Sequence, residues 1–137
     1  MSRKDSDDAV TLLRERFTVR HPSRLRRLVA EVAGRVGLPS RRGEDLALAV
    51  NEAAANAVKH AGGSGELELI QDDQRALVAE ISDNGPGLTG QPIGVLPARD
   101  ATSGRGVYLM QQTCDRVEYR TGTTGTTVSL EMNLDGP

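Results

Sequence analysis

The feature that most constrains the fold of this chain is a switch in the spacing of its apolar residues. Between residues 22 and 61, apolar residues recur every three to four positions, which is typical of amphipathic helices. Between residues 65 and 83 they alternate with polar residues, which is typical of half-buried strands. Helices grouped between and beside strand hairpins favour an α+β fold, a two-layer sandwich of helices on a sheet.

The first half of the chain predicts one strand and two helices. Residues 10–20 alternate loosely and predict the strand. Residues 22–39 predict a helix with Ser23 as its N-cap and Gly37 as its C-terminal stop, closed by Pro39. The second helix is expected from Ser40 to about Ala61, before a Gly-Gly pair. Its apolar stripe consists of Leu46, Val50, Ala53 and Ala57.

The second half predicts two hairpins separated by a long loop and a short helix. The strands of the first hairpin are residues 65–71 and 75–83, and those of the second are residues 115–121 and 125–132. Residues 105–114 suit a short helix. The segment 84–104 is rich in Gly and Pro and too long for an ordinary connection, and such loops are usually functional or disordered. The expected order is therefore β-α-α-β-β-loop-α-β-β.

The composition argues against several classes of protein. Phe17, Tyr108 and Tyr119 are the aromatic residues, so the core must be aliphatic and few side chains could stack on bases. The net charge of −2 gives no electrostatic reason to expect direct binding of nucleic acid. Cys114 is the single cysteine, which rules out an internal disulfide.

The chain predicts one cytoplasmic domain. No apolar stretch near the start is typical of a signal peptide, and no run reaches the length of a membrane span. A length of 137 residues fits a single domain with a real core. We expect that domain to cover residues 9–134, with flexible tails at residues 1–8 and 135–137.

A carboxylate and a carboxamide lie one turn apart on the second helix. At about 100° per residue, Glu52 and Asn56 are about 40° apart, and Lys59 falls close to both. The pair lies at the border of the apolar stripe, where a ligand cavity could reach it. The alternative is a solvated helix edge with an i,i+4 polar pair.

A second candidate site is the sequence DNGPG, which begins at Asp83. The period of two places Asp83 on the same side of its strand as Leu77 and Ile81, and a carboxylate there needs hydrogen-bond donors. An amino group on a flat heterocycle would be a suitable donor. Gly85 and Gly87 would let the backbone approach a ligand closely. The alternative is an ordinary turn, since these residue types are common turn formers.

Two further features complete the set of candidates. Gly104 and Gly106 flank Arg105 just before the short helix, so backbone N–H groups and the positive helix end could bind an anion. Otherwise this is only a flexible entry to a helix. Thr126 starts the last strand on its apolar side, where a hydroxyl needs a partner. Otherwise it is a threonine chosen for its β-propensity.

Taken in order, these motifs resemble those of the GHKL ATP-binding superfamily, which has the Bergerat fold. NEAAANAVKHA resembles its N box, DNGPG and GRG its two glycine boxes, and GTTV its terminal Gly-Thr. The resemblance extends from about residue 10 to 133, and implies a mixed, mostly antiparallel sheet. Within the superfamily the chain looks like the serine-protein kinases that act as anti-sigma factors.

The resemblance implies a role for each candidate residue. It implies Glu52 as the base that accepts the proton of a substrate serine, and Asn56 as the protein ligand of Mg²⁺. Asp83 would bind the adenine amino group of ATP, with Thr126 supporting that contact. Backbone N–H groups near Gly104, Arg105 and Gly106 would bind the phosphates, and residues 88–103 would form the ATP lid.

Several charged residues have simpler interpretations. Lys59 and Arg105 could neutralise phosphate charge, or could be solvated cations. His60 is turned about 80° from Glu52, which favours a capping or packing role. We interpret Arg35, Arg41 and Arg42 as surface charge.

The leading hypothesis is therefore an ATP-dependent protein serine/threonine kinase. It would phosphorylate an anti-anti-sigma antagonist with a STAS domain, and would bind a sigma factor when the antagonist is phosphorylated. The resemblance also implies a homodimer. The alternatives are a nucleotide-gated module that sequesters a regulator without phosphorylating it, and an inactive scaffold that retains only the fold.

Overall fold

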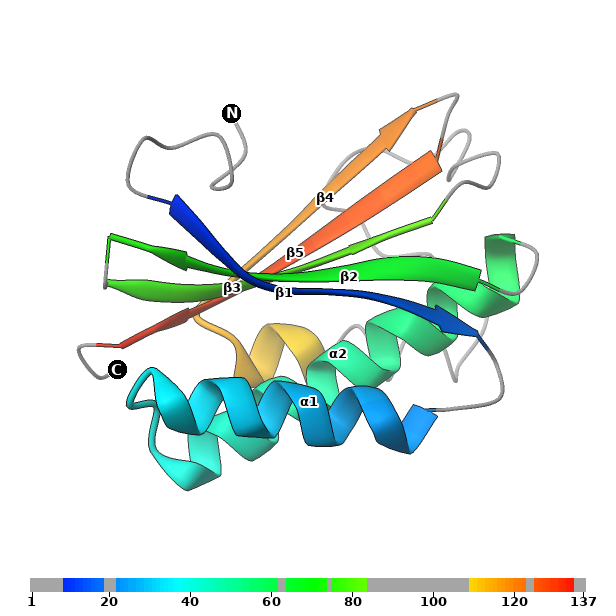
Figure 1. The fold of residues 1–137 in the computed structure, drawn as a ribbon. Coiled ribbons are helices and arrows are strands. Elements are labelled where there is room, and N and C mark those ends of the chain that lie inside the picture. Colours follow the sequence, from blue (N-terminus) through cyan, green and yellow to red (C-terminus); the bar gives the residue numbers. More distant parts are fainter. Residues whose placement is uncertain are drawn as a thin grey trace.

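The computed structural model describes residues 9–18, 22–61, 64–73, 75–83, 109–122 and 125–134. Two long helices pack on one side of a five-stranded sheet (Figure 1). The elements are β1 (Ala9–Thr18), α1 (Pro22–Arg35), α2 (Ser40–Ala61), β2 (Ser64–Asp72), β3 (Ala76–Ser82), β4 (Arg116–Gly122) and β5 (Gly125–Asn133). Residues 109–113 are also helical. The two-layer α+β architecture expected from the sequence is confirmed.

The strands lie in the order β1-β2-β3-β5-β4, and all four pairings between neighbours are antiparallel. Both predicted hairpins, β2–β3 and β4–β5, are present. The last strand of the chain pairs with β3, which leaves β4 at one edge of the sheet and β1 at the other. The sheet that we expected to be mostly antiparallel is thus antiparallel at every described pairing.

The first helix starts and ends for identifiable reasons. α1 begins at Pro22, so the prediction of Ser23 as the N-cap is wrong, and Ser23 lies in the first turn. Proline favours this first position because its fixed φ suits a helix and its missing N–H has no intrahelical partner there anyway. At the other end Gly37 has a φ of +89°. The Leu38 and Gly37 N–H groups donate to the carbonyls of Ala33 and Gly34, which is the Schellman arrangement.

The second helix has the bounds that the sequence predicts. The Gly43 N–H donates to the Pro39 carbonyl at 2.9 Å, which starts the hydrogen-bond ladder of α2. A methyl group on Gly43 would lie 3.3 Å from the Ala33 Cβ, so α1 and α2 pack closely here. The predicted apolar stripe is buried, and it consists of Leu46, Val50, Ala53 and Ala57.

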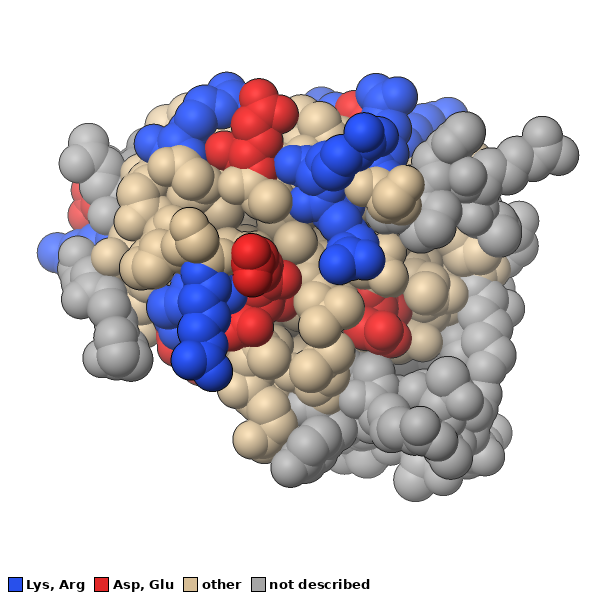
Figure 2. All heavy atoms as spheres, turned by 90° about the horizontal axis from the view of Figure 1, so that it is seen from below, with Lys and Arg blue, Asp and Glu red and all other residues tan. Residues whose placement is uncertain are grey.

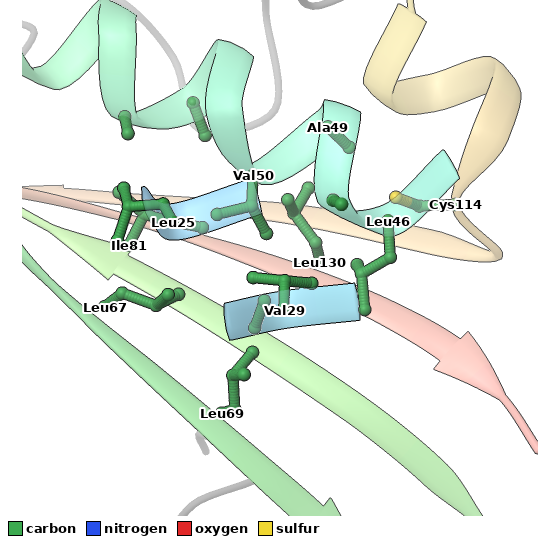
Figure 3. Packing of buried hydrophobic residues seen from close by; sticks show 14 of the residues in the cluster. Leu25, Val29, Leu46, Ala49, Val50, Leu67, Leu69, Ile81, Cys114 and Leu130 are labelled. Atoms are coloured by element: carbon green, nitrogen blue, oxygen red, sulfur yellow. The ribbon is translucent and has the colours of Figure 1, made fainter. Parts of the chain in front are cut away.

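An aliphatic core fills the space between the helices and the sheet. Figure 3 shows Leu46 and Val50 of α2 and Val29 of α1 directed toward Leu69 and Leu130 of the sheet. These five side chains are fully or almost fully buried. Burial of apolar surface stabilises the folded state by about 25 cal/mol per Å², so this core is a main source of the stability of the fold.

The outer face of the sheet is also covered. Glu68 of β2 and Glu80 of β3 are 7% and 5% exposed, although both side chains point away from the helices. Arg14 Nη2 lies 3.4 Å from Glu68 Oε2, and Arg120 Nη2 lies 3.2 Å from Glu80 Oε2. Arg14 lies on β1, the neighbour of β2, whereas Arg120 reaches Glu80 from β4 across the intervening β5. The aliphatic stems of such arginines can cover central carboxylates. The alternation of apolar and polar residues predicted one buried face for β3, whereas the structure buries both of its faces.

Some predictions lie outside the described residues. These are the long loop 84–104, the ATP lid at residues 88–103, the first part of the short helix and the two tails. Among the described helices, none is both long enough and apolar enough to cross a membrane.

Candidate functional site

Asp83 and Thr126 lie side by side at one end of the sheet. The Asp83 backbone N–H donates to the Thr126 carbonyl at 3.0 Å, and the Thr126 N–H donates to Asp83 Oδ1 at 3.3 Å. Thr126 is 7% exposed, whereas Asp83 is half-buried. These two residues, 43 positions apart, were each predicted to lie on the inner side of their strand, and the structure brings them together.

The strands that hold this pair pack against α2, the helix that carries Glu52 and Asn56. α2 packs against β2, β3 and β5. In Figure 1 the end of β3, the start of β5 and the C-terminal end of α2 all lie at the same end of the molecule. The sheet thus supplies Asp83 and Thr126, and the helix supplies the second half of the candidate site.

Glu52 and Asn56 lie on α2 at the border of its buried face. Both are half-buried, while Ala53 and Ala57 beside them are 2% and 8% exposed. Ala55, on the opposite side, is exposed. The small alanine side chains let α2 approach the sheet, and the carboxylate and the amide lie at the edge of this packed face. The predicted position of the pair is confirmed, but its chemistry stays a prediction.

The remaining site predictions fall outside what the structure describes. Lys59 lies in α2, but its side chain is among those not described. Gly85, Gly87, Gly104, Arg105 and Gly106 lie in the segment 84–108, which is not described. The close approach to a ligand predicted for Gly85 and Gly87, and the phosphate contacts predicted for Gly104, Arg105 and Gly106, therefore stay predictions.

An ion pair that the sequence did not reveal links the helix layer to the sheet. Arg42, in the first turn of α2, donates to Asp115 Oδ2 at 2.5 Å, and the Asn133 N–H donates to the same oxygen at 2.6 Å. The Asp115 N–H in turn donates to the Glu131 carbonyl at 2.9 Å. The interpretation of Arg42 as surface charge is therefore wrong, since its side chain is only 20% exposed.

This ion pair joins the start of α2 to the segment that leads into β4. Asp115 lies between the helical residues 109–113, from which Cys114 separates it, and the start of β4 at Arg116. Arg42 lies on the helix that also holds Glu52 and Asn56. The contact joins residues 73 positions apart, so local periodicity contains no signal for it.

Cys114 is buried between this junction and α2. Figure 3 shows its sulfur close to Leu46 and Ala49. Burial raises the pKa of the Cys114 thiol to about 11, because the thiolate loses its solvation there. Burial also raises the pKa of Tyr119 above its usual range, with a smaller contribution from Cys114. Both groups are therefore neutral at pH 7, and the thiol is a packing group rather than a nucleophile.

A hollow lies on the helical face, away from the sheet. It is a groove of about 270 Å³ lined by Ser23, Arg26, Arg27, Ala30, Glu44 and Ala47. In Figure 2, which looks onto this face, basic and acidic side chains lie close together over the helices. None of the residues that line this groove belongs to the candidate nucleotide site, which consists of Glu52, Asn56, Asp83 and Thr126. The groove is therefore separate from that site.

Comparison with known protein families agrees with this geometry. The model of the histidine kinase-like ATPase domain matches residues 16–132, which include Glu52, Asn56, Asp83 and Thr126. The chain belongs to the histidine kinase-like ATPase family. The GHKL resemblance drawn from the motifs is thereby confirmed.

Two proteins with a named activity are similar to most of the chain. The serine-protein kinase RsbW of Bacillus pumilus (strain SAFR-032) is 32% identical over 130 residues, covering 81% of this chain and 77% of the relative. The serine-protein kinase RsbW of Bacillus subtilis (strain 168) is 30% identical over 129 residues, covering 82% and 78%.

A solved structure shares the fold. The histidine kinase domain of the blue-light activated histidine kinase from Erythrobacter litoralis EL346 superposes with a TM-score of 0.61 at 19% identity. The match covers 83% of this chain and 63% of that chain. At this identity the likeness supports the ATPase family's fold, and the activity has to be argued from the site itself.

Proposed function

We propose that this chain is an ATP-dependent protein serine/threonine kinase that acts as an anti-sigma factor. Its substrate is an anti-anti-sigma protein of the STAS type, and its second partner is a sigma factor. The observation that carries the proposal is Glu52, one turn before Asn56 on the half-buried border of α2, in a chain 32% identical to a serine-protein kinase. A carboxylate at this position suits an enzyme that deprotonates a hydroxyl group.

The described residues fit ATP and Mg²⁺ by the chemistry of their donors. Asp83 offers a carboxylate, held by the Thr126 N–H, to the amino group of adenine. Asn56 offers an amide oxygen, a hard neutral ligand that suits Mg²⁺, which usually binds through few protein groups together with phosphate and water. ATP bound here supplies the phosphoryl group, and Mg²⁺ offsets its charge.

The residues of this chain would then divide the work of phosphoryl transfer. Glu52 would accept the proton of the attacking serine hydroxyl, and Asn56 would hold Mg²⁺, which would offset phosphate charge. Asp83 and Thr126 would fix the position of the adenine ring of ATP. Lys59 and Arg105 would neutralise phosphate charge, and the backbone N–H groups near Gly104, Arg105 and Gly106 would hold the phosphates. Gly85 and Gly87 would let the backbone approach the nucleotide closely. Phosphoryl transfer needs mainly this positioning and charge neutralisation, without covalent catalysis by the protein.

The test is phosphoryl transfer from labelled ATP, with Mg²⁺, to the STAS-domain proteins encoded beside its gene. We expect label on a serine or threonine of one antagonist. Glu52→Gln should abolish transfer and leave ATP affinity within about threefold, since the base acts only in the chemical step. Asp83→Asn should instead weaken ATP binding.

Other outcomes would identify a different function. ATP binding without transfer to any of these antagonists would favour a nucleotide-gated module that sequesters a regulator without phosphorylating it. Unchanged ATP affinity in Asp83→Asn would overturn the assignment of the nucleotide site. The proposed homodimer is tested separately, by sedimentation of the protein with and without ATP.

A further inference from the structure

A row of four residues crosses the inner face of the sheet, and its last two members are Asp83 and Thr126, the pair proposed to bind adenine. Phe17 of β1 pairs with Gly65 of β2. Continuing the β2–β3 register one step beyond Glu66↔Ser82 puts Gly65 opposite Asp83. Continuing the β3–β5 register beyond Ser82↔Thr127 puts Asp83 opposite Thr126, in agreement with their hydrogen bonds. Gly65 is thus the strand neighbour of Asp83 on the side away from Thr126.

The space over Gly65 is already occupied. A methyl group on its Cα would lie 2.5 Å from Cζ of Phe17 and 2.6 Å from the Ser82 carbonyl oxygen. Both distances are well below ordinary carbon contacts, so a side chain here would force its neighbours to move. The Phe17 ring is the far end of a side chain and can turn. The Ser82 carbonyl is backbone within the sheet and cannot move alone.

The Ser82 carbonyl belongs to the peptide group that also contains the Asp83 N–H. That N–H donates to the Thr126 carbonyl at 3.0 Å. Because the peptide group is planar, a push on its oxygen from Gly65 tilts the N–H on the other side and moves the Cα of Asp83 with it. Gly65 and Thr126 therefore hold this single peptide group from its two sides.

We propose that Gly65 is a positioning residue for Asp83: its missing side chain lets the Ser82–Asp83 peptide lie where the Asp83 carboxylate meets the adenine amino group. The inference rests on the proposed function, because it assigns Asp83 to adenine. Phe17 has the complementary role of filling the space above Gly65, and it is 5% exposed. Gly65 thus acts on specificity through Asp83, and Phe17 acts on stability.

The experiment compares ATP with inosine triphosphate, which has a carbonyl oxygen in place of the adenine amino group. Both are titrated calorimetrically into the full chain with Mg²⁺, and urea unfolding is measured for the same variants. We expect the wild type to prefer ATP by about tenfold or more, the usual effect of one hydrogen bond to a charged group. Gly65→Ala should raise the Kd for ATP and leave that for inosine triphosphate nearly unchanged, so that most of the preference is lost.

Phe17→Leu is the matched control, because it alters the same contact from the other side. It should lower the midpoint of urea unfolding and keep the preference for ATP. The double variant, Gly65→Ala with Phe17→Leu, relieves the overlap with the ring but not that with the Ser82 carbonyl. It should regain part of the stability lost in Gly65→Ala without regaining the preference, and it also serves if Gly65→Ala alone does not fold.

The outcomes separate this inference from the proposed function. If the wild type shows no preference for ATP, or Asp83→Asn leaves the preference unchanged, the role of Asp83 fails and the inference fails with it. If Asp83→Asn removes the preference but Gly65→Ala, alone or with Phe17→Leu, retains the wild-type ratio, only the positioning role is overturned. A merely structural role for Gly65 would weaken binding of both nucleotides equally.

Discussion

Asp83 and Thr126 hold each other by hydrogen bonds in both directions, backbone N–H to carbonyl at 3.0 Å and backbone N–H to carboxylate at 3.3 Å. The first bond ties the end of β3 to the start of β5. The second orients the Asp83 side chain. A carboxylate held in this way has lost part of its conformational freedom before any ligand arrives, which lowers the entropy lost on binding.

Thr126 and Thr127 offer a direct test of which face of β5 binds nucleotide. Thr126 lies on the inner face, whereas the Thr127 hydroxyl is 3.1 Å from the Ser82 hydroxyl on the outer face. We expect Thr126→Val to raise the Kd for ATP about three- to tenfold, the effect of one neutral hydrogen bond. Thr127→Val, the same change on the other face, should leave the Kd within about twofold, as measured by calorimetry. Equal effects of the two substitutions would contradict the assignment.

The elements of this fold could be predicted because their signals are local. α2 has the predicted bounds from Ser40 to Ala61. Pro39 directly before it and two glycines directly after it are local signals for the start and the end of a helix. Parity along each strand likewise put Asp83 and Thr126 on the inner side. The N-cap of α1 was missed because proline, itself a good first residue, starts that helix at Pro22, two positions before the start at Arg24 that Ser23 as N-cap would require.

The contacts between distant elements could not be predicted in the same way. The insertion of β5 between β3 and β4 makes Asp83 and Thr126 neighbours, and no periodicity encodes a strand order. The same holds for Arg42, whose partner Asp115 lies 73 positions away. Glu80 is polar in an alternating pattern, yet its place on a central strand beneath Arg120 buries it. Such features depend on which elements meet in three dimensions.

The ion pair between Arg42 and Asp115 should contribute to stability more than a typical surface pair. Its side chains are 20% and 23% exposed, and Asp115 also accepts the Asn133 N–H. We expect Arg42→Met, which keeps the aliphatic stem, to lower the free energy of unfolding by about 1–3 kcal/mol, because it removes a charged hydrogen bond. Urea unfolding monitored by circular dichroism measures this change.

Arg35 provides the matched control for that substitution. It pairs with Glu31 at 3.2 Å, but both side chains are about two-thirds exposed, at 69% and 65%. Arg35→Met should therefore change the free energy of unfolding by less than about 0.5 kcal/mol. A double-mutant cycle of Arg42→Met with Asp115→Asn should give a coupling energy of about 1 kcal/mol or more. Additive effects would mean that the two side chains do not stabilise each other.

The end of α1 predicts opposite effects for two neighbouring glycines. Gly37 has a φ of +89°, a conformation that costs a residue with a Cβ about 1 kcal/mol, so Gly37→Ala should destabilise by that amount. Gly34 lies inside the helix with open space around its Cα, and Gly34→Ala should stabilise by about 0.5–1 kcal/mol. The two shifts in thermal unfolding midpoint should have opposite signs. Shifts of the same sign would contradict the Schellman arrangement.

Burial of Cys114 predicts a loss of stability at alkaline pH. The pKa of its thiol rises from 9.0 to about 11 in the folded chain, so between these values the folded state binds more protons than the unfolded state. The contribution of this group is therefore complete below about pH 9 and is lost as the pH rises toward 11, by on the order of 2 kcal/mol. Urea unfolding at a series of pH values should show this decline in the wild type and a smaller decline in Cys114→Ala. Some decline should remain in that variant because burial also raises the pKa of Tyr119.

The thiol of Cys114 should also react with iodoacetamide at pH 8 much more slowly in the folded chain than in urea. Rapid labelling of the folded chain would contradict its burial.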